Sequence, residues 1–335
     1  MRWLQIASFT FLIPSVAFAT RWNEPFHEEL VRRSDAFAKI RVLSAEEDKK
    51  SENSSDFALP ENDPSDLNVE VLAVYAGDAP KKLTVSHYTF NQYYGDEHSG
   101  LGIGGEYYVF LEKDDRGWGI ATPTAGFVEA KDDLIVGSYR ISCAGGFYET
   151  QWYVETQTLL FQLLHGDQSN KAKLSALVTE QLKQPSKVFG GIGDPKLALT
   201  FFKQSASNEI LAMMPELAPN VNLDPFLAAA DFHAQISGIR ALSARKGKLV
   251  VDRLIGFLTE PTSEAVPRVV AVRALQKHAI SSAQRKRLIT ILATADTERV
   301  DLCGGSIMDP RIVPGYTSVS LKMALSELLD SLKAK

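Results

Sequence analysis

Apolar positions between residues 231 and 293 recur at steps of three and four, and the same pattern is written twice. Residues 239–242 (IRAL) return 33 positions later as residues 272–275 (VRAL). Residues 252–258 (DRLIGFL) return 34 positions later as residues 286–292 (KRLITIL). Such steps place the apolar side chains on one stripe of an α-helix. Each copy therefore predicts two short helices joined by a turn, and a repeat of this length is typical of helical-pair solenoids.

The turns and the flanking sequence extend this helical pattern. Ser281 and Gln284 have the spacing of a capping box, in which each side chain satisfies an unpaired backbone N–H at the start of a helix. Residues 319–332 predict one more amphipathic helix. On these features the chain resembles HEAT-type repeats over about residues 190–335. The resemblance implies an extended array of stacked helices.

The first part of the chain has a different, strand-like pattern. Aromatic and β-branched residues alternate with polar ones in short runs, and Gly and Asp residues separate the runs. This pattern predicts a small antiparallel barrel or sandwich. The predicted strands cover residues 36–43, 67–75, 83–88, 106–111, 118–121 and 134–141. Residues 147–164 and 171–182 are predicted to be helical.

The order of these strands resembles the bacterial members of the netrin-like, or tissue-inhibitor-of-metalloproteinase-like, superfamily. The matching segments are residues 35–42 (DAFAKIRV), 74–77 (VYAG), 83–85 (LTV) and 104–111 (GGEYYVFL). The resemblance covers about residues 34–130 and implies an OB-type barrel. The family usually has a Cys just before the Gly-x-Tyr strand, whereas residues 98–101 hold none here. Animal inhibitors place an N-terminal Cys amine on the protease zinc, and the expected mature start, Thr20, is not a Cys. The resemblance therefore implies the fold and not that mechanism.

Together the patterns predict an α+β chain with two domains. A small antiparallel, OB-like and netrin-like β-barrel domain spans residues 20–140. A helical connector follows over residues 141–189, and a HEAT-like helical solenoid spans residues 190–335. With 335 residues in the chain, two domains of this size each have room for a core.

The first 19 residues have the pattern of a signal peptide. Arg2 precedes an apolar run over residues 3–18, and the small-x-small end predicts cleavage after Ala19. The run is short and interrupted by Pro14, which disfavours a membrane span, although an uncleaved anchor is the alternative. We therefore expect an exported protein without a membrane span, periplasmic or extracellular in a bacterial host.

The chain has two cysteines, Cys143 and Cys303. In an oxidising compartment two thiols of this kind usually pair, so the sequence predicts a disulfide between them. The alternative is two buried free thiols. Two cysteines alone do not make a zinc site.

Charge is distributed unevenly along the chain. Residues 235–299 hold 12 Lys or Arg against 5 Asp or Glu, whereas residues 44–78 hold 10 acidic residues against 2 Lys. The basic stretch is either the solvated faces of the repeat helices or a surface for an acidic partner. Export argues against nucleic acid as that partner. The candidate binding residues in this stretch are Arg240, Arg273, Lys277, Arg285 and Arg287.

The insert at residues 91–104 offers a second candidate binding surface. Tyr93 and Tyr94 could stack on a sugar or grip a peptide, with His98 beside them. Alternation along strands would instead bury about half of the neighbouring aromatic residues. His87, Glu97 and His98 could also gather around a metal ion or serve a hydrolase, although their spacing matches no known zinc motif.

Two further motifs carry little weight. Residues 100–105 satisfy G-x-G-x-x-G, but a polar loop precedes them and a strand follows, whereas nucleotide binding needs a strand before and a helix after. No Ser lies in a G-x-S-x-G elbow. We therefore expect no cofactor and, as the leading hypothesis, a non-enzymatic binding or adaptor protein that recognises another protein or an envelope component. The alternatives are an envelope hydrolase or metal-dependent enzyme at His87, Glu97 and His98, and a protease inhibitor acting through the barrel rim.

Overall fold

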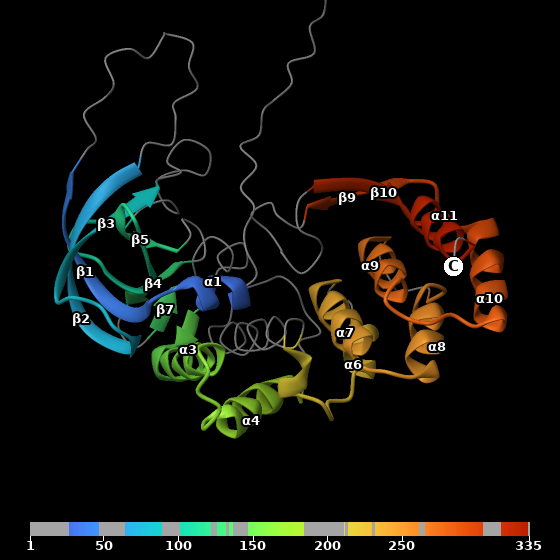
Figure 1. The fold of residues 1–335 in the computed structure, drawn as a ribbon, viewed down its shortest axis with the longest axis horizontal. Coiled ribbons are helices and arrows are strands. Elements are labelled where there is room, and N and C mark those ends of the chain that lie inside the picture. Colours follow the sequence, from blue (N-terminus) through green and yellow to red (C-terminus); the bar gives the residue numbers. More distant parts are fainter. Residues whose placement is uncertain are drawn as a thin grey trace, which may run out of the picture.

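The structure, a computed structural model, combines a β-barrel with an array of α-helices (Figure 1). The barrel lies at one end of the molecule and the helices from residue 224 onward lie at the other. The predicted signal peptide lies outside the described residues. Those residues are 27–46, 64–88, 101–121, 126–131, 134–136, 147–183, 211, 214–229, 232–260, 265–303 and 316–333.

Five strands close into a barrel. Their order is β1-β2-β3-β5-β4, and a further pairing of β1 with β4 completes the ring. This closed barrel confirms the barrel prediction and is compatible with an OB-like fold. The five strands are β1 (Ala36–Glu46), β2 (Pro64–Gly77), β3 (Lys82–Tyr88), β4 (Glu106–Asp114) and β5 (Gly117–Ile120).

The prediction of a purely antiparallel barrel was wrong at one joint. β3 and β5 run parallel, with Val85 opposite Trp118 and Ser86 opposite Gly119. The reason is topological, because β5 forms a tight hairpin with β4 and then closes against a strand that precedes β4. Beyond β4 the sheet continues through three short strands, β6 (Phe127–Lys131), β7 (Leu134–Val136) and β8 (Phe147–Glu149).

The two central strands of the barrel supply side chains to two different cores. On β1 and β4, Ile40 and Val109 are fully buried within the barrel. Their neighbours Phe37 and Phe110 belong instead to the core that continues into the helices. Because successive side chains of a strand point to opposite faces, both faces of these strands are apolar. This explains why β1 is buried almost continuously from Ala36 to Val42.

An aromatic cluster joins the outer face of the barrel to two helices, α1 (His27–Arg33) and α3 (Thr150–Leu164). The ring of Phe37 stacks on that of Phe110, with centroids 4.8 Å apart, and meets Tyr153 of α3 edge-on at 6.1 Å. Tyr108 lies 6.3 Å from Tyr153. Burial raises the pKa of the hydroxyls of both tyrosines, so they stay neutral. These contacts make the barrel and α3 parts of one core.

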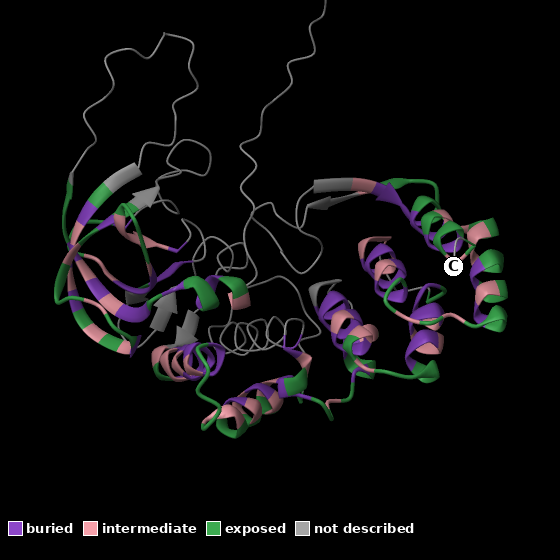
Figure 2. Ribbon diagram, viewed as in Figure 1, coloured by how far each residue is buried: buried purple, intermediate pink, exposed green. Residues whose placement is uncertain are grey.

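The remaining helices form two layers (Figures 1 and 2). In one layer α9 packs against α7 and α11, and in the other α8 packs against α10. Buried residues lie on the sides that face each other. The helices are α4 (Lys171–Leu182), the short 3-10 helix η1 (Pro215–Leu217), α6 (Asp224–Leu227), α7 (Phe232–Ala244), α8 (Lys248–Phe257), α9 (Ala265–Leu275), α10 (Ser282–Thr294) and α11 (Leu321–Ser331).

Several local predictions in this region are confirmed. The predicted capping box forms, since Gln284 N–H donates to the Ser281 hydroxyl and Gln284 Oε1 accepts from Ser281 N–H at 2.9 Å. A two-stranded ribbon, β9 (Arg299–Cys303) with β10 (Tyr316–Ser320), stands between α10 and α11. Among the residues that the structure describes, none of the helices combines the length and the apolar character needed to cross a membrane.

A small ion network crosses the outside of the barrel. Glu106 on β4 accepts from Lys39 Nζ at 2.6 Å and from Arg41 Nη2 at 2.5 Å, both on β1. These two hydrogen bonds lower the pKa of Glu106, with Lys39 contributing most. Cross-strand pairs of opposite charge stabilise the register of neighbouring strands modestly.

Replacing Phe37 with Ala would test the aromatic cluster. We expect the free energy of unfolding to fall by about 3–5 kcal/mol, because a large buried ring is removed from a packed core. Urea denaturation followed by tryptophan fluorescence would measure the loss. Leu43→Ala on the same strand is the control, since Leu43 is 44% exposed and its loss should change stability by less than about 0.5 kcal/mol. Equal losses for both variants would contradict the assignment of Phe37 to the core.

Glu106→Gln would test the ion network through pH. The folded pKa of Glu106 lies below its ordinary value of 4.5, so its stabilisation is full above that value and is lost as pH falls through the folded pKa. We expect the variant to be about 1 kcal/mol less stable at pH 7 and to match the wild type in strong acid. Urea midpoints at several pH values would show this. Glu327→Gln, on the exposed side of α11, is the control and should show no such convergence.

Candidate functional site

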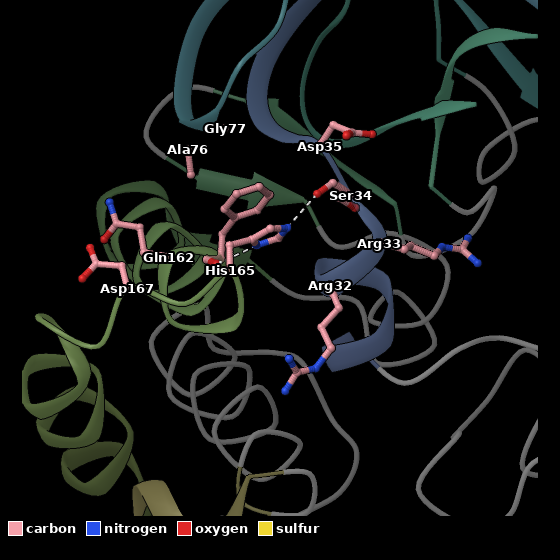
Figure 3. Close-up of a pocket in the computed structure, with 10 residues that line it drawn as sticks. Arg32, Arg33, Ser34, Asp35, Ala76, Gly77, Gln162, His165 and Asp167 are labelled. Carbon is pink, nitrogen blue, oxygen red and sulfur yellow. Dashed lines mark hydrogen bonds between the residues drawn. The ribbon is translucent and has the colours of Figure 1, made fainter. Parts of the chain in front are cut away.

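A cleft of about 600 Å³ opens where α1, the start of β1, the end of β2 and the end of α3 meet (Figure 3). Its walls therefore come from segments that are more than a hundred residues apart in the sequence. The residues that line it are Arg32, Arg33, Ser34, Asp35, Ala76, Gly77, Phe161, Gln162, His165 and Asp167.

His165 holds the two sides of the cleft together. Its Nδ1 lies 2.9 Å from the carbonyl oxygen of Phe161, one turn earlier, and its Nε2 lies 3.1 Å from the carbonyl oxygen of Ser34 (Figure 3). The imidazole also stacks on the ring of Phe161, with centroids 3.9 Å apart. Both ring nitrogens thus face backbone acceptors, which places His165 as a clamp between α3 and the junction of α1 with β1.

The cationic side chains of the cleft are engaged with other parts of the chain. Arg32 pairs with Glu28 at 2.7 Å, and Arg33 pairs with Glu112 at 3.1 Å and donates to the carbonyl oxygen of Ala121. In Figure 3 both guanidinium groups point away from His165. The cleft therefore presents little uncompensated positive charge.

The remaining polar groups of the cleft have partners as well. The hydroxyl of Ser34 is buried and donates to the carbonyl oxygen of Leu30 at 2.7 Å. The carboxylate of Asp35 accepts from the N–H of Lys113 at 2.6 Å. Asp167 accepts from Ser169, and these hydrogen bonds lower the pKa of Asp167. A nucleophilic hydroxyl beside a free base needs a different arrangement, so the chemistry of this cleft fits structural support better than catalysis.

Gly77 brings the end of β2 against the junction of α1 with β1. Its φ of 74° lies in the left-handed region, and a Cβ at this position would collide with the carbonyl oxygen of Asp35. Only a glycine meets both conditions without strain. The sequence motif at residues 74–77 thus has a physical role in shaping this wall of the cleft.

A second candidate site lies on the helical layers, where polar side chains connect α6, α8 and α10. Arg253 of α8 pairs with Asp224 of α6. One step further along, Asp252 of α8 accepts from Arg287 Nη1 at 2.9 Å and from Gln284 Nε2 at 3.1 Å, both of α10. Arg253 and Arg287 are equivalent positions of the repeat, so the same contact is used twice. We call this set of contacts the polar ladder.

The structure divides the predicted basic candidates between the two helical layers. Arg240 and Arg273 are half-buried on the neighbouring helices α7 and α9, and Lys277 is exposed just after α9. Arg285 and Arg287 belong to α10 in the other layer, and Arg287 is committed to the polar ladder. The five residues are therefore not one basic face.

Several other candidates lie where the structure gives no description. Tyr93, Tyr94, Glu97, His98 and Cys143 are outside the described residues. His87 on β3 and Cys303 on β9 are described in their backbone only. The predicted disulfide and the loop site therefore stay predictions. Within the described residues no group of three or more His, Cys, Asp or Glu is placed to hold a metal ion.

Comparisons with family models, with curated proteins and with solved structures gave no match for this chain. Its function is therefore argued from the geometry of the chain itself. The polar ladder was within reach of sequence reasoning, because the repeat aligns Arg253 with Arg287. The clamp at His165 was not, because its partners are backbone carbonyls, which no residue type signals.

Gly77→Ala would test the close approach at the cleft. We expect it to lower the free energy of unfolding by about 1–3 kcal/mol more than Gly104→Ala. Gly104 also has a positive φ, 84°, but a Cβ there would meet nothing within 4 Å, so that variant carries the backbone strain alone. Urea unfolding of both variants gives the difference. Equal losses would show that the contact with Asp35 is not tight.

Proposed function

We propose that the chain is an exported, non-enzymatic binding or adaptor protein, in which a HEAT-like helical array carries the binding surface. The observation that carries the proposal is the polar ladder, which connects α6, α8 and α10 by side chains at repeat-equivalent positions. Proteins of stacked repeats present extended surfaces to partners, because each repeat contacts only its neighbours. The predicted signal peptide supports export.

Equivalent burial in the two copies of the repeat supports the HEAT-like interpretation. Leu254 and its counterpart Leu288 are both fully buried. Ile239 and its counterpart Val272 are also fully buried, on the neighbouring helices α7 and α9. Residues at one repeat distance thus have the same role in packing, as expected when two copies of one structural unit stack.

The barrel fits the role of a compact scaffold in this proposal. The closed ring of five strands supports the OB-type part of the netrin-like resemblance. One part of its outer face is covered by α1 and α3 through the aromatic cluster. The polar groups of the cleft beside that cluster are all engaged within the chain, which favours a supporting role over turnover of a substrate.

Photocrosslinking would test the proposal. A photoreactive amino acid would replace Lys277 or Thr290, both exposed on or next to the helices, in cells that express the full chain. We expect the same partner to be crosslinked at one or both positions, with identification by mass spectrometry. Lys81, exposed beside β2, is the matched control on the barrel and should give a much lower yield of that partner.

Two results would count against this function. One is an equal yield of the same partner at Lys81, which would remove the helical array as the binding surface. The other is turnover of an envelope substrate by the purified chain that Glu97→Gln or His98→Ala abolishes, which would establish the enzymatic alternative.

A further inference from the structure

The two equivalent helices α8 and α10 differ in one respect. Ile255 of α8 and Ile289 of α10 are 34 residues apart and occupy the same position of the repeat. Ile255 is 1% exposed, whereas Ile289 is 52% exposed. A large apolar side chain is thus buried in one copy of the repeat and open to solvent in the next.

The polar ladder shows which side of the helix is involved. Asp252 contacts α10 through Arg287 and Gln284. Ile255 follows Asp252 by three residues and therefore lies on the same side of α8. That side of α8 is covered by α10, whereas in the described part of the chain no further helix of this layer packs against the matching side of α10.

The charge at this position is reversed between the two helices. The residue of α10 that matches the acidic Asp252 is Lys286, which is exposed. Asp252 attracts the arginine of the helix beside it. Lys286 would repel an arginine at that place and attract a carboxylate. Half-buried Arg285 on the same side adds a second positive charge.

We propose that this side of α10, which we call the α10 face, is a docking surface for an amphipathic helix of a partner protein. The face is defined by Arg285, Lys286, Ile289, Leu292 and Ala293. The partner helix lies beside α10 as α10 lies beside α8. It places apolar residues over Ile289 and an acidic residue against Lys286. The proposal rests on the binding function above and names its surface and the chemistry of the partner.

Charge favours this occupant over a second copy of the chain in a symmetric contact. A two-fold contact between two α10 faces would bring Arg285 and Lys286 of both copies together. Like charges at such a contact are unfavourable. An acidic amphipathic helix instead meets both the exposed isoleucine and the positive charge.

The test uses the chain's own α10 as a probe. A fluorescent, helix-stapled peptide with the sequence of residues 281–295 would carry the substitution Arg287→Glu, and the unsubstituted peptide would be compared with it. We expect the full-length chain to bind the substituted peptide about fivefold more tightly, because one pair of like charges becomes a pair of opposite charges. Fluorescence polarisation measures both affinities.

Variants of the chain sharpen the result. Lys286→Glu is expected to reverse the preference, so that the unsubstituted peptide binds more tightly. Ile289→Asp is expected to remove binding of both peptides. Leu249→Asp is the control, because Leu249 is 78% exposed on α8 but lies outside the α10 face, and binding should persist. These positions are exposed, so unchanged circular dichroism would show that the variants remain folded.

Three outcomes would overturn the proposal. These are an absence of binding by either peptide, a preference that Lys286→Glu does not reverse, and an equal loss of binding for Leu249→Asp and Ile289→Asp. Self-association of the chain that Ile289→Asp abolishes would show that a second copy occupies the face, which also overturns it. A partner crosslinked at Lys277, with no peptide preference, would retain the binding function and discard the α10 face alone.

Discussion

The stacking of Phe37 on Phe110 is the contact on which the arrangement of the two parts depends. These rings project from the outside of a closed barrel, where most side chains would meet water. Tyr153 of α3 covers them, and α1 is tied to α3 through a hydrogen bond of 2.6 Å between His27 and Gln157. The barrel, α1 and α3 therefore form one packed unit, and the position of the later helices starts from it.

The helical layers are held together in a different way. Apolar side chains fill the space between the layers, while charged and amide groups at one repeat distance align neighbouring helices within a layer. The apolar contacts supply most of the stabilisation, since ion pairs at the surface contribute little. The polar ladder instead specifies which helix lies beside which.

Much of the architecture could be predicted from the sequence, for physical reasons that differ by region. The period of 34 residues places Leu254 and Leu288 alike, and strand alternation marks β1 and β4. The parallel joint of β3 with β5 could not be predicted, because alternation does not show which strand is the neighbour. For the same reason the basic candidates could not be assigned to layers, since a helical stripe shows which residues share a face of one helix but not where the next helix lies.

The two-sided character of β1 has a consequence for synthesis of the chain. Phe37 and Phe110 leave the ribosome well before Tyr153, which covers them, so the barrel is completed while an aromatic surface still faces solvent. Domains generally fold from the N-terminus during synthesis, and exposed apolar surface at that stage promotes aggregation. The nascent barrel is therefore a natural client for chaperones until α3 has followed it.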